Sequence, residues 1–101
     1  MPNIHVGTSS ADAPSRARVG TTSEVIIPEN INRVGLIVTN ISEQTIYIGI
    51  GNTATLTAGI VLTGGGGAWS MDDYTYSKEA ITGIGHAATL TVAFQEFVLR
   101  P

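Results

Sequence analysis

The chain has 101 residues and a mass of 10.5 kDa, which is the size of a single domain with one modest core. Hydrophobic residues make up 43% of it and charged residues only 13%, a balance that excludes disorder by composition. The net charge of −3 excludes the basic surface of a nucleic-acid-binding protein, and the lack of cysteine excludes disulfides and thiolate chemistry.

The amino-acid composition predicts an all-β fold. The chain contains 12 Ile, 8 Val and 13 Thr, and such β-branched side chains fit a pleated sheet better than a helix. Glycines separate the apolar runs, as is typical of short strands joined by turns. No apolar run is long enough to cross a membrane, and the N-terminus has no apolar segment of the signal-peptide kind.

The first segment, residues 1–22, is predicted to be an extended N-terminal arm outside a β-sandwich domain of residues 23–101. It is rich in small polar residues and shows no hydrophobic period. Deleting residues 1–20 is therefore expected to leave the domain folded but to weaken partner binding at least tenfold. The arm supplies four candidate partner-binding residues, Ile4, Val6, Arg16 and Arg18, of which the arginines would pair with carboxylates.

Strands are predicted over residues 25–27, 33–41 and 45–50. The second and third have apolar residues on both faces, as expected for central strands of two packed sheets. Since residues 40–44 are rich in turn formers, the two strands are expected to pair as a hairpin.

The C-terminal half is predicted to hold a strand at 60–62, a flexible glycine loop at 64–67 and a closing hairpin of 79–84 with 88–99. Strand signals every 8–12 residues, about seven or eight in all, indicate a small antiparallel β-sandwich or barrel. Between the glycines and the hairpin lie three aromatic residues, Trp69, Tyr74 and Tyr76. They are candidates for a partner-binding or sugar-binding platform, although a single Trp in a small β domain is more often part of the core.

An internal similarity joins residues 49–57 to residues 83–91. Seven of the nine positions are identical, and both segments are predicted to be strand–turn–strand corners, equivalent in the two sheets. Each also matches the G-x-G-x-x-A dinucleotide pattern. The strand-like residues that follow lack the helix N-terminus that a pyrophosphate needs, so turn glycines are the preferred interpretation.

No catalytic, cofactor or metal site is predicted. Asp72 and Asp73 lack the further oxygen ligands that calcium requires, and His5 and His86 are too few for zinc. The serines have no activating base, so no enzyme activity is expected.

The pattern R-V-G-L-I-V-T-N-I-S at residues 33–42, T-I-Y-I-G-I-G at 45–51 and A-G-I-V-L at 58–62, followed by the glycine run, resembles small β-sandwich domains of tailed-bacteriophage virion proteins. The resemblance covers residues 31–97. It implies a structural role in the virion, as a capsid decoration (cement), head-fibre, neck or tail protein, and it brings no catalytic residues.

The sequence and the resemblance together lead to one expected function. We expect a jelly-roll-like sandwich that decorates the capsid, binds the major capsid protein and forms a homo-oligomer, with a trimer expected. It would be assembled in the host cytoplasm and end on the capsid surface, without nucleic-acid or membrane partners. The alternative is a host-adhesive or carbohydrate-binding module of a head fibre, neck or tail, which would use the aromatic residues and the glycine loop.

Overall fold

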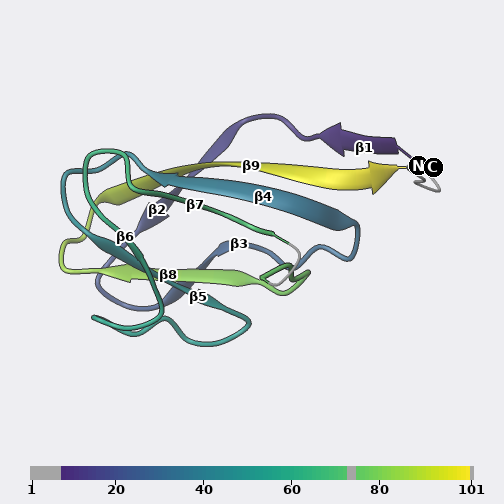
Figure 1. Cartoon of the computed structure of the whole chain (residues 1–101). Helices are drawn as coiled ribbons and strands as arrows, with labels where there is room; N and C mark the ends of the chain where they lie inside the picture. The colour runs from purple at the N-terminus through teal and green to yellow at the C-terminus, as the bar shows by residue number, and fades with distance from the viewer. Residues whose placement is uncertain (1–7, 73–74, 101) are drawn as a thin grey trace.

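The protein is all-β in its computed structural model, which describes residues 8–72 and 75–100 (Figure 1). β-branched residues dominate the strands, and glycines and polar residues occupy the connections between them. Nine strands follow one another: β1 (Thr8–Ala11), β2 (Ser15–Val19), β3 (Glu24–Ile27), β4 (Arg33–Asn40), β5 (Ile46–Ile50), β6 (Ile60–Leu62), β7 (Ala68–Ser70), β8 (Ile81–Gly85) and β9 (Leu90–Arg100).

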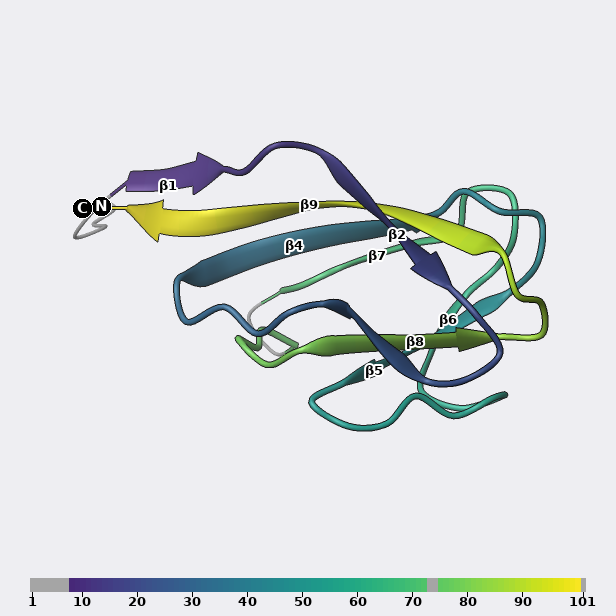
Figure 2. The same cartoon turned by 180° about the vertical axis from the view of Figure 1, so that it is seen from behind.

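The strands form two antiparallel sheets that pack face to face, as Figures 1 and 2 show from opposite sides. In sheet A the order is β1-β9-β4-β7, and β2 continues the β1 edge by pairing with β9. Sheet B has the order β3-β8-β5-β6. From β2 to β5 the chain changes sheet at every connection, and this strand order is that of a jelly roll. The predicted small β-sandwich is therefore confirmed, and the strand order excludes an immunoglobulin-like arrangement.

The core lies between the sheets and consists almost entirely of aliphatic side chains. Alternate residues of β4 and β9 face inward, because side chains in a strand alternate between its two faces. The buried cluster comprises Val19, Ile26, Ile27, Leu36, Val38, Ile46, Ile48, Leu62, Ile81, Leu90 and Val92.

The N-terminal segment is not an arm outside the sandwich over its whole length, which corrects the predicted boundary at residues 22 and 23. β1 pairs with the end of β9, and β2 pairs with its beginning, in a register that sets Val19 opposite Leu90. Val19 is fully buried in the core. Residues 8–19 thus provide the edge of sheet A, whereas residues 1–7 lie outside the described residues.

Both predicted hairpins are wrong. β4 belongs to sheet A and β5 to sheet B, so residues 41–45 form an arch between sheets; β8 and β9 are likewise separated. The buried Asn40 side chain holds the first arch, because its amide donates to the Gln44 and Leu62 carbonyls at 2.7 and 2.8 Å. Its Oδ1 accepts from the Ser42 backbone N–H at 2.9 Å. These bonds replace the ladder that a hairpin would have made.

The glycine run is a tightly held turn rather than the predicted flexible loop. Gly65 N–H donates to the Ser42 carbonyl and Gly66 N–H to the Asn40 carbonyl, at 2.8 and 2.9 Å. Asn40 N–H in turn donates to the Gly67 carbonyl at 2.8 Å. The turn is therefore fastened to the arch after β4.

The internal similarity does not reflect structural equivalence. Residues 49–57 run from β5 into a connection that returns to the same sheet, whereas residues 83–91 run from β8 in sheet B to β9 in sheet A. The identical residues therefore belong to two different kinds of connection, one within a sheet and one between the sheets.

Candidate functional site

The buried charge of the protein is structural. Arg33 is fully buried, and its Nε donates to Glu96 Oε2 at 2.7 Å. The remaining guanidinium N–H groups donate to the carbonyls of Ser77, Glu79 and Pro28 at 2.8–3.1 Å. One side chain thus joins β4 and β9 to two connections at one end of the sandwich.

An apolar surface lies at the same end, where β4 begins and β9 ends. Ile31, Val34, Tyr76 and Leu99, which we call the end patch, are exposed by 75%, 39%, 40% and 40%. Backbone contacts hold them together: Leu99 N–H donates to the Asn32 carbonyl, and the Tyr76 hydroxyl donates to the Arg33 carbonyl. Exposed apolar side chains that gather at one place are typical of protein-binding surfaces.

The outer face of sheet A carries mostly small, uncharged side chains. Side chains on one face of a sheet follow the pairing register, which gives the row Arg16, Ala93, Thr39 and Ala68 across four strands. The next row contains Gln95, Ile37 and Ser70, with Ile37 45% exposed. Between these rows lies a shallow hollow of about 230 Å³ that is also lined by Pro14.

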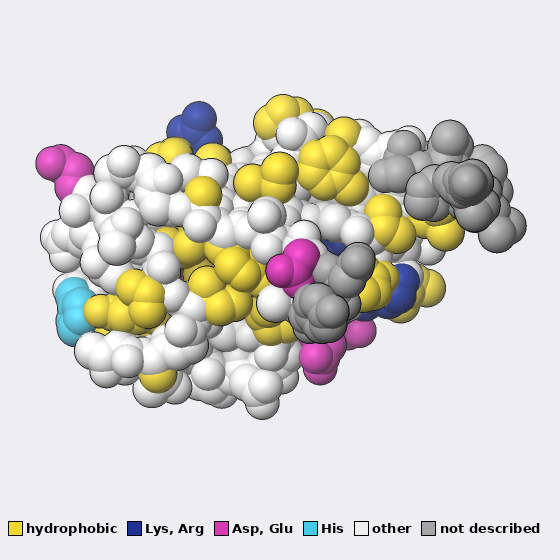
Figure 3. Space-filling model, in the orientation of Figure 1, with side chains coloured by type: hydrophobic (Ala, Val, Ile, Leu, Met, Phe, Trp, Pro, Cys, Tyr) yellow, Lys and Arg dark blue, Asp and Glu magenta, His cyan; other side chains and the backbone are white. Residues whose placement is uncertain are grey.

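Two cations stand at the β2 edge of this face. Arg16 and Arg18 are two positions apart, so they point to the same side of the strand, and both are exposed. In the space-filling view a basic side chain (dark blue) projects from the upper surface of the molecule (Figure 3). Within residues 8–72 and 75–100, no carboxylate lies within 4.0 Å of either guanidinium.

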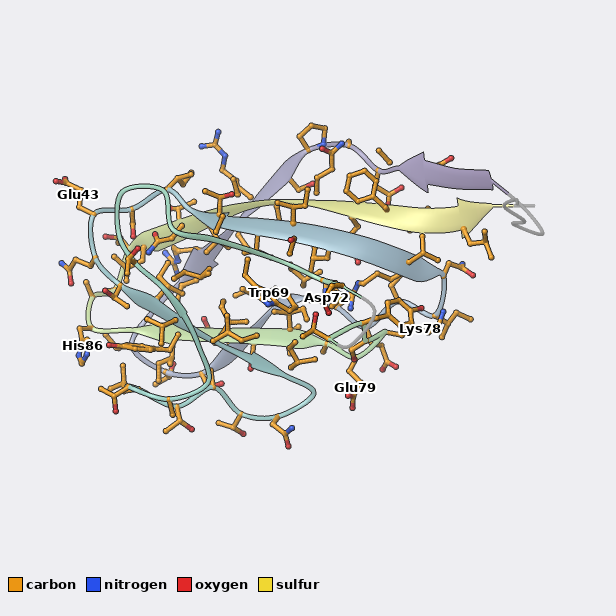
Figure 4. All side chains as sticks on the ribbon, viewed as in Figure 1. Glu43, Trp69, Asp72, Lys78, Glu79 and His86 are labelled. Carbon is orange, nitrogen blue, oxygen red and sulfur yellow. The ribbon has the colours of Figure 1, made fainter. Side chains whose placement is uncertain are left out.

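Acidic side chains line a groove of about 670 Å³ on the sheet B side of the molecule. Glu24 begins β3, Glu29 follows that strand, and Glu79 precedes β8 and projects away from the sandwich (Figure 4). The groove also includes Asn52 and Thr82, whose hydroxyl donates to the Asn52 carbonyl at 2.6 Å. No Lys, Arg or His is among the described residues that line it. We call it the acidic groove.

The predicted partner-binding residues have different locations. Arg16 and Arg18 are exposed on sheet A, as a binding role requires. Trp69 is partly buried and packs against the core, opposite the fully buried Val38, so packing accounts for it. Ile4, Val6 and Tyr74 lie outside the described residues.

Sequence reasoning missed the end patch and the acidic groove. Their residues come from separate connections that only the folded sandwich brings together. One feature of the sequence could have indicated the end patch. Ile31 follows a turn-forming Pro-Glu-Asn run, and a large aliphatic side chain in a turn lies outside the core and is exposed.

The described side chains show no arrangement for metal chemistry. Within residues 8–72 and 75–100, no three His, Asp or Glu side chains are placed to hold a metal ion. His86 is exposed and stacks edge-on against Tyr47, with ring centroids 6.0 Å apart. No helix in this part of the chain is long and apolar enough to cross a membrane.

Comparison with known proteins adds evidence on the fold. No family model and no curated protein matches the sequence. A solved structure described as "Bacillus endospore appendages form a novel family of disulfide-linked pili" is similar, with a TM-score of 0.55 and 19% sequence identity. The match covers 99% of this chain and 96% of that chain. At this identity the similarity shows a common fold and no more.

Proposed function

We propose that the protein is a structural subunit that acts by binding other protein surfaces, as a capsid decoration protein of a tailed phage. The observation that carries the proposal is the end patch, where four large apolar side chains are exposed at one end of the sandwich. β1 begins at this end, with Thr8 opposite Arg100, and it directly follows residues 1–7 of the sequence, which include the predicted partner-binding residues Ile4 and Val6. The jelly roll is compatible with this role, since many capsid domains share it, but a fold alone does not assign a function.

In this role the protein stabilises the shell by mass action. A subunit that binds only the assembled lattice, at 100 times its Kd, stabilises it by about 2.7 kcal/mol per site. Subunits joined in an oligomer gain about 10²–10⁴ in avidity. Binding of this kind depends on apolar and neutral polar contacts, which suits a chain with 13% charged residues.

A second candidate is a subunit of a surface fibre. It is favoured by the similarity, over nearly the whole of both chains, to a structure whose description concerns pili. That description specifies disulfide-linked pili, whereas this chain has no cysteine. A fibre of this protein would therefore be held by non-covalent contacts alone.

Immunogold electron microscopy distinguishes the two candidates. An antibody against the purified protein is applied to particles released from the cells that produce it. Gold on phage heads supports decoration, and gold on filaments without heads supports the fibre. Gold confined to tails, or label that stays with unassembled protein, contradicts both.

The end patch has its own test. Ile31→Ser with Leu99→Ser is expected to weaken co-sedimentation with the labelled particles at least tenfold, because contact residues at the centre of an interface carry most of its binding energy. The control is Val61→Ser on β6, at the edge of sheet B, where the valine is 52% exposed, a value between those of Ile31 and Leu99. Equal binding by both variants would show that the end patch is not the contact surface.

A further inference from the structure

We propose that the outer face of sheet A binds a second copy of this chain, with Arg16 and Arg18 of one copy entering the acidic groove of the next. This inference rests on the proposed structural role and names a partner for it. The contact joins two different surfaces, so it is a head-to-tail contact that repeats from copy to copy.

Of the lysine and arginine side chains that the structure describes, Arg16 and Arg18 are the two that the fold leaves unpaired. The Arg33 guanidinium is already paired in the interior, with the Glu96 carboxylate and three backbone carbonyls. Lys78 donates to the Ile31 carbonyl at 2.6 Å and lies 5.4 Å from the Tyr76 ring centroid. Within the described part of the chain, the Arg16 and Arg18 side chains make no hydrogen bond or ion pair. Arginine suits such a contact, because its planar guanidinium binds carboxylates in a bidentate manner.

The acidic groove has the charge and the size to receive an arginine side chain. Three glutamates line it, and none of them forms an ion pair within the described part of the chain. Its volume of about 670 Å³ falls in the range of sites that hold whole small ligands, so it has room for a guanidinium. Val25, 58% exposed, adds an apolar wall against which the stem of an arginine can pack.

A contact between these arginines and the acidic groove requires two copies of the chain. Arg16 and Arg18 lie on the outer face of sheet A, whereas the groove residues Glu24, Val25 and Thr82 belong to strands β3 and β8 of sheet B. The two sheets pack face to face with the core between them (Figure 1). A symmetric pairing of two sheet A faces would set the arginines against neutral strand residues, since the outward-facing residues in the described strands of that sheet include no Asp or Glu. The neutral rows beside the arginines allow the faces to approach closely. Depending on the rotation between copies, such contacts close a ring, such as a trimer, or continue as a filament.

A charge swap tests the inference on the full-length protein by sedimentation velocity. One variant carries Arg16→Glu and Arg18→Glu, and the other carries Glu24→Arg and Glu79→Arg. Each variant alone presents like charges at the contact and is expected to associate at least tenfold more weakly than the wild type. In an equimolar mixture every contact between unlike variants has opposite charges, so association into mixed pairs and alternating assemblies is expected to recover. Wild-type association is expected to weaken as salt rises, because exposed charges are screened.

Lys78→Glu is the control for the Arg16→Glu and Arg18→Glu variant, since it also makes the net charge more negative but lies outside both surfaces, and it is expected to leave association unchanged. A wild type that stays monomeric at every concentration overturns the inference, as does association that neither swap reduces. Swapped variants that fail to recover on mixing overturn it too. The proposed function is judged separately, because gold label on phage heads or filaments does not depend on contacts between copies in solution.

Discussion

At the scale of single residues, Arg33 contributes most to the architecture. Its buried guanidinium satisfies one carboxylate and three carbonyls that come from separate segments. We expect Arg33→Met to lower the free energy of unfolding by about 3–5 kcal/mol, since removing one partner leaves a largely buried charge uncompensated. Urea denaturation measures this loss, which is a large part of the ~5–15 kcal/mol of a typical domain.

Two further variants make the Arg33 prediction specific. Arg33→Met combined with Glu96→Leu is expected to recover part of the loss, because the unpaired carboxylate is then removed. Arg16→Met at an exposed position is expected to change stability by less than about 0.5 kcal/mol. A loss at Arg33 as small as that at Arg16 would mean that the ion pair does not hold this end together.

At the scale of elements, the glycine turn fixes where sheet A meets the β4–β5 arch. A Cβ on Gly64 would run into the backbone carbonyl of Glu43, which has no room to move within the arch. We expect Gly64→Ala to cost about 1–3 kcal/mol, the range for overpacking a closely fitted site. Gly20→Ala is the matched control, since its Cβ would meet its nearest neighbour, the Ala88 carbonyl oxygen, at 3.9 Å. Thermal unfolding measures both, and equal melting temperatures would contradict a close-fitting turn.

The elements also show which features of the fold could be predicted from the sequence. Strand positions at 25–27, 33–41, 45–50 and 60–62 were predictable, because β-branched runs and turn residues mark local structure. Pairing was not predictable, because a short polar connection serves an arch as well as a hairpin. The deciding group, the Asn40 amide, receives its partner Leu62 from 22 positions away. The end patch and the acidic groove could not be predicted from the sequence either, because their residues come together only in the folded protein. Arg16 and Arg18 were the exception.

At the scale of the whole molecule, the N-terminal segment divides into residues 8–19, which belong to the sandwich, and residues 1–7, which precede β1 in the sequence. Deleting residues 1–7 leaves every described strand in place, so we expect an unchanged melting temperature and at least tenfold weaker binding to the labelled particles, with the loss of Ile4 and Val6. Deleting residues 1–19 removes β1, β2 and the buried Val19, and bares the edge of β9. We expect that variant to unfold or aggregate, because an exposed long strand edge recruits other chains. Circular dichroism and co-sedimentation measure the two effects separately. If the protein without residues 1–19 is folded and soluble, the sandwich does not need β1 and β2. If binding is undiminished without residues 1–7, those residues do not contribute to the contact.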